Sequence, residues 1–243
     1  MMKTEREHRD EIVRVGKALY DRGFVVAMDG NISVRLDAER ILVTPTCMCK
    51  GMMTGDDLVI VNQHGHKLHG RRNVSSELGM HLLIYSMRPD VHSVVHAHPP
   101  TATGFAAAGV ALDQALVSEV VLTLGKVPLA KYGTPGTAEL TESLRPLVHE
   151  HCSILMANHG VVSYGESLEQ AFMRMETVEH FAKIALVTRT LGTPQELPAE
   201  DVCKLEAIRE RMKLMSPTNG HPPRMEAVGT VGDNEPDRVP VNE

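Results

Sequence analysis

Three segments of the chain carry apolar residues at helical spacing. In residues 4–22 apolar side chains recur every three to four positions, and Gly23 follows as a stop signal. Residues 75–90 begin with two serines suited to N-capping, and their helical pattern ends before Pro89. Residues 167–192 begin with a serine and close with a glycine. The pattern therefore predicts three helices.

Apolar and polar residues alternate, or form short apolar runs, in four other segments. Residues 32–45 contain two alternating runs around a polar turn, which predicts a β-hairpin. Residues 56–62 and 91–98 each read as one strand. Residues 153–165, "SILMANHGVVSYG", predict a buried strand, a turn at "NHG" and a second strand.

Three further segments are harder to assign. The small residues of 101–109 suggest a short helix, and the apolar run 119–124 fits either a helix or a strand. Residues 137–151 have a helical pattern, which Pro146 would kink or break. Because strands alternate with helices but are joined partly by hairpins, we expect α/β layers with a mixed or antiparallel sheet rather than a regular doubly wound fold.

Residues 1–215 are expected to form one domain, and residues 216–243 a flexible C-terminal tail. The tail sequence contains five prolines, no aromatic residue and no apolar periodicity. Such a composition cannot bury enough apolar surface to offset the entropy lost on ordering.

Composition narrows the class of protein. The 243 residues carry a net charge of −6, which argues against a nucleic-acid partner. No apolar run approaches the length of a membrane span, and the N-terminus is charged where a signal peptide would be apolar. Four cysteines are too few for a disulfide scaffold. We therefore expect a cytoplasmic protein with reduced thiols and no membrane partner.

The stretch "VVHAHPP" places two histidines at the end of a predicted strand. His96 and His98 are one residue apart, so their side chains lie on the same face, about 7 Å apart along the strand. Pro99 and Pro100 cannot continue a central strand. The pair could bind one metal ion, or it could be two polar residues facing solvent where the strand ends, because two ligands do not make a site.

His159 supplies a third candidate ligand. It follows the buried strand in "SILMANHG", and Gly160 would free the turn. A catalytic zinc ion commonly has three protein ligands and an open position. Three imidazoles suit zinc, although cobalt or manganese could substitute.

Glu77 lies in the first turn of the helix predicted after Ser75 and Ser76. A carboxylate there could simply stabilise the helix dipole. However, this helix leads into the strand of His96 and His98, and antiparallel packing would return Glu77 towards the end of that strand. Beside a metal ion, it could act as a general acid or base.

Other histidine sites fit less well. A cupin oxygenase site needs a glutamate four residues after the second histidine, where this chain has Ala102. A hydrolytic H-x-H-x-D-H site needs an aspartate at Pro100. A separate metal site remains open for two cysteines and two histidines elsewhere in the chain: Cys47, Cys49, His64 and His66.

Six motifs in fixed order resemble the class II sugar-phosphate aldolases of the aldolase/adducin superfamily. They are "MDGNISVRL", "VTPT", "SSE", "VVHAHPP", "YGTPGT" and "ANHGVVSYGESLEQAF", and the resemblance runs from about residue 5 to about residue 192. It implies an α/β layered sandwich with a central mixed, mainly antiparallel sheet flanked by helices, which commonly assembles as a homotetramer. Active sites would lie at the subunit boundaries.

The resemblance also implies roles for individual residues. His96, His98 and His159 would bind zinc, and Glu77 would be the acid/base residue. The substrate phosphate would lie among residues of three motifs: Gly30, Asn31, Thr46, Ser75 and Ser76.

Two departures from the family pattern concern the substrate. The family usually has glycine after "TP[ST]", where this chain has Cys47. Residues 105–131 lack the tyrosine that fuculose aldolases supply from a neighbouring subunit, so Tyr132 and Tyr164 are candidate secondary acid/base groups. The candidate substrates are therefore L-fuculose 1-phosphate, 5-deoxyribulose 1-phosphate and 5-methylthioribulose 1-phosphate.

The resemblance implies metal-dependent cleavage of a ketose 1-phosphate to dihydroxyacetone phosphate and an aldehyde. Glu77 would protonate C3 of the three-carbon fragment, and the metal ion would stabilise its negative charge. Epimerase, dehydratase and decarboxylase activities of the same superfamily remain alternatives. A non-catalytic adducin-like binding module is a further alternative, which the three histidines and Glu77 disfavour.

Overall fold

The six predicted strands and two further short ones pair into one eight-stranded sheet in the computed structural model of the chain, which describes residues 3–214. The strand order is β4-β3-β2-β1-β5-β8-β7-β6, and all neighbours are antiparallel except β6 and β7. The mixed, mainly antiparallel sheet agrees with the prediction. The strands are β1 Asn31–Arg35, β2 Arg40–Val43, β3 Val59–Asn62, β4 Lys67–His69, β5 Ser93–Ala97, β6 Leu129–Ala130, β7 Ser153–Met156 and β8 Gly160–Gly165.

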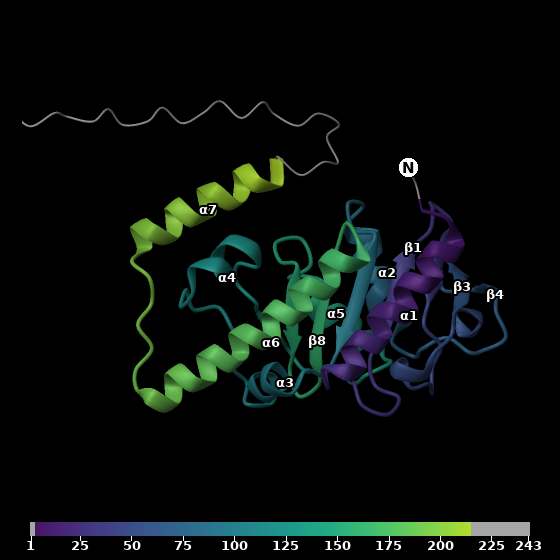
Figure 1. Ribbon diagram of the computed structural model, residues 1–243, viewed down its shortest axis with the longest axis horizontal. Helices are drawn as coiled ribbons and strands as arrows, with labels where there is room; N and C mark the ends of the chain where they lie inside the picture. Colours follow the sequence, from purple (N-terminus) through teal and green to yellow (C-terminus); the bar gives the residue numbers. More distant parts are fainter. Residues whose placement is uncertain (1–2, 215–243) are drawn as a thin grey trace, which may run out of the picture.

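Helices cover both faces of the sheet. Figure 1 shows α1 and α6 crossing in front of the strands, whereas α2 and α5 lie behind them. The helices are α1 Glu5–Asp21, α2 Leu78–Met87, α3 Pro100–Ala107, α4 Ser118–Thr123, α5 Ala138–Leu144, α6 Leu168–Leu191 and α7 Ala199–Leu214, with short 3-10 helices η1 Lys50–Met52 and η2 Gly55–Asp57.

Strand alternation divides the core into two clusters. In β5, Val95 packs on the face covered by α1 and α6, and Val94 packs on the opposite face with α2 and α5. Val161 and Val162 of β8 separate in the same way. Because side chains two apart share a face, His96 lies on the α2 side of the sheet.

The structure corrects several element boundaries. The ambiguous segment 119–124 forms most of α4, so it is helical. The helix predicted over 137–151 ends at Leu144, before Pro146, because proline lacks the amide that helix continuation needs. The short strands β4 and β6 and the helix α7 were not predicted. Helix α7 packs beside α4 (Figure 1).

Strand pairing gathers several chain segments at one edge of the sheet. The first residue of β1, Asn31, pairs with His96 near the end of β5. The turn between β7 and β8, which contains His159, closes where Met156 pairs with Gly160. The start of α2 reaches the same edge, because Glu77 lies beside His96 and His159.

The tail predicted over residues 216–243 lies outside the described residues. Among residues 3–214, none of the helices combines the length and apolarity that crossing a bilayer would require.

Candidate metal centre and active site

Three histidines from β5 and the β7–β8 turn converge at this edge. The ring centroids of His96 and His98 are 4.9 Å apart, and that of His159 lies 4.7 Å and 5.2 Å from them, respectively. One nitrogen from each ring falls within 4.8 Å of the others. Among the His, Cys, Asp and Glu side chains of residues 3–214, these three histidines have the spacing needed to hold a metal ion.

Strand pairing and a tight turn position the histidine rings. His96 is fully buried between β1 and β8, paired with Asn31 and Val162. His159 follows Asn158, which has a left-handed backbone (φ 55°) in the tight β7–β8 turn. Gly160 is required for close approach, since a Cβ there would lie 2.5 Å from the His98 ring. Thus Asn158, rather than Gly160, supplies the left-handed conformation of the turn.

The hydrogen bonds of two rings leave a position suited to a cation. His96 Nδ1 donates to the Val161 carbonyl at 2.9 Å, and His98 Nδ1 faces the Asp29 carboxylate at 3.3 Å. Both Nδ1 atoms therefore carry the proton in the neutral rings, which leaves lone pairs on the Nε2 atoms. These two Nε2 atoms are 3.1 Å apart. Two facing lone pairs repel each other, and a shared cation removes that repulsion.

Burial supports neutral rings. It lowers the pKa of His96 to about 3, and it also lowers the pKa of His98. Neutral imidazole is the form that binds metals. The third ring leaves one nitrogen, His159 Nδ1, buried without a hydrogen-bond partner, and its Nε2 points to the same centre. The residues present therefore fit a metal ion with three imidazole ligands.

Glu77 faces the three histidines. Its Oε1 lies 3.0 Å from His159 Nε2, and its Oε2 lies 3.4 Å from His96 Nε2. Oε2 also accepts a 2.8 Å hydrogen bond from Asn31 Nδ2. Only 12% of the side chain is exposed. The carboxylate is therefore held beside the candidate metal position.

The start of α2 differs from the prediction. Glu77 occupies the N-cap position, and its side chain makes no capping hydrogen bond. Ser75 Oγ instead accepts from the Glu77 amide at 3.2 Å, outside the helix. A simple capping role for the Glu77 carboxylate is thereby disfavoured, because the side chain turns towards the histidines.

The residues predicted for a phosphate pocket fall into two groups. Asn31 and Ser75 meet beside Glu77, with 3.4 Å between Asn31 Nδ2 and Ser75 Oγ. Gly30 has φ 69°, and a Cβ there would lie 2.7 Å from the His96 carbonyl, so glycine is required. Ser76 instead packs against Gly136 in the loop before α5.

Thr46 lies in the turn after β2, which is joined to the segment before α2. Its amide donates to the Asn73 carbonyl at 3.0 Å. The next residue, Cys47, has φ 54° and is exposed, so a side chain occupies the left-handed position where the family usually has glycine. The buried Lys50 joins this turn to the loop before β1, because its Nζ donates to the Met28 and Met48 carbonyls.

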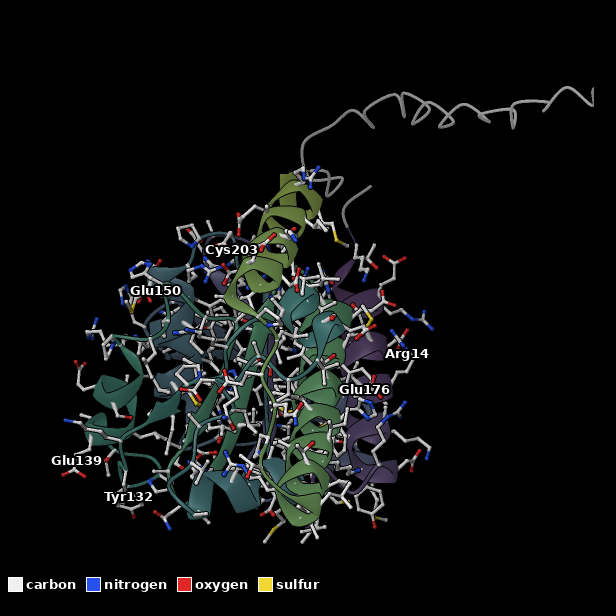
Figure 2. All side chains as sticks on the ribbon, turned by 90° about the vertical axis from the view of Figure 1, so that its left-hand side faces the viewer. Arg14, Tyr132, Glu139, Glu150, Glu176 and Cys203 are labelled. Carbon is white, nitrogen blue, oxygen red and sulfur yellow. The ribbon has the colours of Figure 1, made fainter. Side chains whose placement is uncertain are left out.

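The two candidate tyrosines differ in accessibility. Tyr164 is fully buried, and its hydroxyl donates to the His151 carbonyl at 2.6 Å, at the opposite end of β8 from the histidines. It is therefore wrong as a secondary acid/base group. Tyr132 is 58% exposed after β6, and Figure 2 shows it at the surface near Glu139.

Four residues near the histidines were not singled out from the sequence. Asp29 orients His98, and Ser33, His81 and Tyr85 form a buried hydrogen-bonded group behind Asn31. The sequence did contain a signal for His81. It follows Glu77 by four residues in a predicted helix, and residues four apart lie on the same helix face.

The separate metal site considered for the cysteines is not formed. The thiols of Cys47 and Cys49 do not join His64 and His66 in any metal-binding group among the described residues. His64 and His66 lie in the exposed turn between β3 and β4, with ring centroids 6.4 Å apart.

Comparison with known proteins identifies related chains. Residues 10–186 match the family described as "Class II Aldolase and Adducin N-terminal domain". A 3-oxo-tetronate 4-phosphate decarboxylase from Pectobacterium atrosepticum is 33% identical over 210 residues, covering 84% of this chain and 94% of that protein. A 5-deoxy-D-ribulose 1-phosphate aldolase from Bacillus thuringiensis is 32% identical over 199 residues, covering 81% and 92%, respectively.

A solved structure of an L-fuculose 1-phosphate aldolase has the same fold. It superimposes with a TM-score of 0.79 at 30% sequence identity. The match covers 87% of this chain and 98% of that one. Aldolases and a decarboxylase are thus related to this chain at nearly equal identity.

Proposed function

The chain belongs to the class II aldolase and adducin family, and from that premise we propose that it is a metal-dependent carbon–carbon lyase acting on a phosphorylated ketose. The observation that carries the proposal is the convergence of three imidazoles and the Glu77 carboxylate at one edge of the sheet. An adducin-like binding module would not need a carboxylate held 3.0 Å from one of these rings.

His96, His98 and His159 would hold the metal ion, which we propose to be zinc, with cobalt or manganese as substitutes. A divalent cation in this position would supply a Lewis acid for negative charge that develops on substrate oxygens. Asp29 and the Val161 carbonyl keep the Nδ1 protons of two rings directed away from the centre.

The two oxygens of Glu77 have different surroundings. Oε2 accepts from Asn31, whereas Oε1 faces only His159 Nε2, at 3.0 Å, a nitrogen whose lone pair would be taken up by the metal ion. We therefore assign the transferred proton to Oε1. In aldol cleavage the C3–C4 bond breaks, the electron pair stays on C3, and Oε1 gives C3 its proton. In condensation the same oxygen would remove that proton.

The phosphate would lie beside Asn31, Ser75 and the Thr46 turn. Hydroxyl, amide and backbone N–H groups there could bind an anion without an arginine clamp. Gly30 allows the backbone to approach the His96 strand closely, so a phosphate bound here would lie next to the candidate metal position.

A decarboxylase is the second candidate, because one of the relatives is named a 3-oxo-tetronate 4-phosphate decarboxylase. The chemistry of the two reactions converges. Loss of carbon dioxide from a 3-oxo-tetronate 4-phosphate leaves the electron pair on C2, and protonation of C2 gives dihydroxyacetone phosphate. Cleavage of a ketose 1-phosphate ends in the same product. Protonation by Glu77 would serve both reactions.

The second proton separates the two candidates. Aldol cleavage must also remove the proton of the C4 hydroxyl, so that C4 becomes an aldehyde, whereas decarboxylation has no such proton. Tyr132 is the exposed tyrosine proposed for this step, with Tyr164 excluded by its burial.

We propose that the chain assembles as a homotetramer. Three apolar side chains near the candidate site are exposed in the single chain and could be covered by a neighbouring subunit: Val26, Met28 and Met52. A cytoplasmic location is proposed on composition. The preferred substrate would be one of the three ketose 1-phosphates named above.

The test is a substrate panel assayed for each product. The metal-loaded chain is incubated with these ketose 1-phosphates and with 3-oxo-tetronate 4-phosphate. Dihydroxyacetone phosphate would show lyase activity, an accompanying aldehyde would assign the aldolase, and carbon dioxide would assign the decarboxylase. Metal-free protein is the control. If no substrate yields dihydroxyacetone phosphate while metal is bound, the proposed function is wrong.

A further inference from the structure

A buried row of polar side chains extends from Glu77 into the core between β1 and α2. Glu77, His81 and Tyr85 are spaced four residues apart at the start of α2 and along it, and Asn31 and Ser33 are two apart on β1. Residues four apart on a helix are separated by about 6 Å, and residues two apart on a strand by about 6.7 Å. The two spacings nearly match, so the side chains of the strand insert between those of the helix.

Hydrogen bonds connect each neighbour in this row. Asn31 Nδ2 donates to Glu77 Oε2 at 2.8 Å, and Asn31 Oδ1 is hydrogen bonded to His81 Nε2. His81 Nδ1 lies 2.7 Å from Ser33 Oγ, which lies 2.8 Å from the Tyr85 hydroxyl. His81, Ser33 and Tyr85 are all buried, with exposures of 4% or less.

The direction of each hydrogen bond follows from the carboxylate. An ionised carboxylate only accepts, so the NH₂ group of Asn31 must face Glu77 and its Oδ1 must face His81. An amide oxygen also only accepts, so His81 carries its proton on Nε2. In the neutral ring Nδ1 is then an acceptor, and Ser33 donates its one proton to it. Tyr85 therefore donates to Ser33 at 2.8 Å rather than to the more distant His92 carbonyl at 3.4 Å. Every donor in the row points towards Glu77.

Neutral His81 is the form that burial favours. Burial lowers the pKa of this imidazole to about 4. If the Asn31 amide were reversed, its oxygen would face the Glu77 carboxylate and its NH₂ would face the Nε2–H of His81. Both contacts would be repulsive. With the proton on His81 Nε2, the Asn31 side-chain amide therefore has a single favourable orientation.

We propose that His81 is a positioning residue, whose Nε2–H fixes the side-chain amide of Asn31 and thereby holds Glu77 in place for proton transfer. The role of Glu77 rests on the proposed function, whereas the hydrogen-bond arrangement of His81 does not. Asn31 also borders the proposed phosphate pocket, so one imidazole would set both the acid/base group and a substrate contact.

The first test is independent of activity. In the metal-loaded protein with ¹⁵N-labelled histidine, NMR should show His81 protonated at Nε2 and unprotonated at Nδ1. In His81→Leu, which retains volume but lacks a donor, hydrogen exchange of the Asn31 side-chain NH₂ should accelerate. An Nδ1–H tautomer in the wild-type protein, or unchanged exchange in the variant, would overturn the proposal, whether or not the lyase assignment holds.

The second test uses turnover of the substrate found in the panel. A displaced catalytic group can cost about a hundredfold, so His81→Leu should lower kcat by about ten- to a hundredfold with bound metal retained. KM should change less than kcat. His81→Gln can still donate to Asn31 Oδ1 and should recover most of the loss. If His81→Leu turns over normally, or if Gln and Leu are equally impaired, the positioning role is wrong.

A matched pair of serine variants controls for packing. Ser33 and Ser153 are both fully buried on strands, and each bonds another hydroxyl. Ser33→Ala removes the donor to His81 and should lower kcat, whereas Ser153→Ala removes only the bond to Ser163 and should leave kcat unchanged. Equal effects of the two substitutions would assign the loss to packing and contradict the proposal.

Discussion

At the scale of single residues, the site depends on where the imidazole protons lie. His96 and His98 donate through Nδ1, whereas His81 donates through Nε2 in the proposed arrangement. The first pair thereby directs lone pairs to the candidate metal position, and His81 directs a proton towards the amide that contacts Glu77. Opposite tautomers would thus serve metal binding and positioning.

Loss of a ligand should release the metal. In His96→Ala or His159→Ala two imidazoles would remain, which are too few for a closed site, so most bound metal should be lost. Elemental analysis of the purified proteins measures this. His64→Ala, in the exposed β3–β4 turn, is the matched control and should retain metal. Undiminished metal in both site variants would refute the ligand assignment.

The stability of the metal-free protein should depend on the protonation of His81. Burial lowers the pKa of folded His81 to about 4 from its ordinary value of 6.5. Between these values the unfolded chain binds a proton that the folded chain does not, so the free energy of unfolding falls as the pH falls. His81→Gln removes this group, and the slope of that free energy with pH should decrease by up to about 1.4 kcal/mol per pH unit.

Urea unfolding of the metal-free wild-type protein and of His81→Gln, at several values from about pH 7 to about pH 4, measures the two slopes. The same slope in both proteins would mean that His81 titrates normally, and that the imidazole is not held neutral by burial.

At the scale of elements, α6 stabilises the start of α3 next to the histidines. The buried Glu179 carboxylate accepts from the amides of Thr101 and Ala102, with distances from 2.9 to 3.2 Å. These amides are among the four at a helix start that lack partners within the helix. Because α3 begins two residues after His98, this contact also supports the end of the β5 segment.

Glu179→Leu should therefore destabilise the fold. It leaves two backbone donors without partners, which costs about 1–3 kcal/mol for each unsatisfied group. Denaturant unfolding measures the loss. Lys183→Met is the control, because it removes only the 3.4 Å ion pair of a 59% exposed lysine and should cost less than about 1 kcal/mol. If Glu179→Leu and Lys183→Met lower the free energy of unfolding equally, the hydrogen bonds from Glu179 to α3 do not account for the loss.

The sequence predicted those parts of the site that local pattern determines. The strand carrying His96 and His98, the "NHG" turn and the helix after Glu77 each have a local signal. The role proposed for His81 depends on the register between β1 and α2, which are 46 positions apart at the Asn31–Glu77 hydrogen bond. No local pattern encodes that register, so the row behind Glu77 was not predicted.

Three secondary-structure elements were also not predicted, because their sequences lack a clear local pattern. Strands β4 and β6 are three and two residues long, too short for an alternating pattern. Helix α7 has no clear apolar stripe, although Glu200 and Lys204 form an i,i+4 pair at its start. Its exposure is visible in Figure 2, where Cys203 lies on the surface.

At the scale of the whole molecule, residues 1–215 are proposed to be sufficient for the fold. A truncation that removes residues 216–243 should keep the melting temperature of the full chain, because the composition of this segment cannot offset the entropy of ordering. Differential scanning calorimetry of both proteins measures it. A large drop would show that the segment packs on the fold or across a subunit interface, and turnover of the same protein would show whether it covers the site.

The central claim is that Glu77 transfers a proton beside a bound metal ion, and Glu77→Gln tests it most directly. The substitution keeps the shape of the side chain and removes proton transfer. General acid/base groups contribute about 10² to 10⁴-fold in rate, so cleavage of the preferred substrate should fall at least about a hundredfold. Metal content, measured on the same sample, should be unchanged. A Glu77→Gln protein that retains its metal and turns over at a near-normal rate would contradict the mechanism.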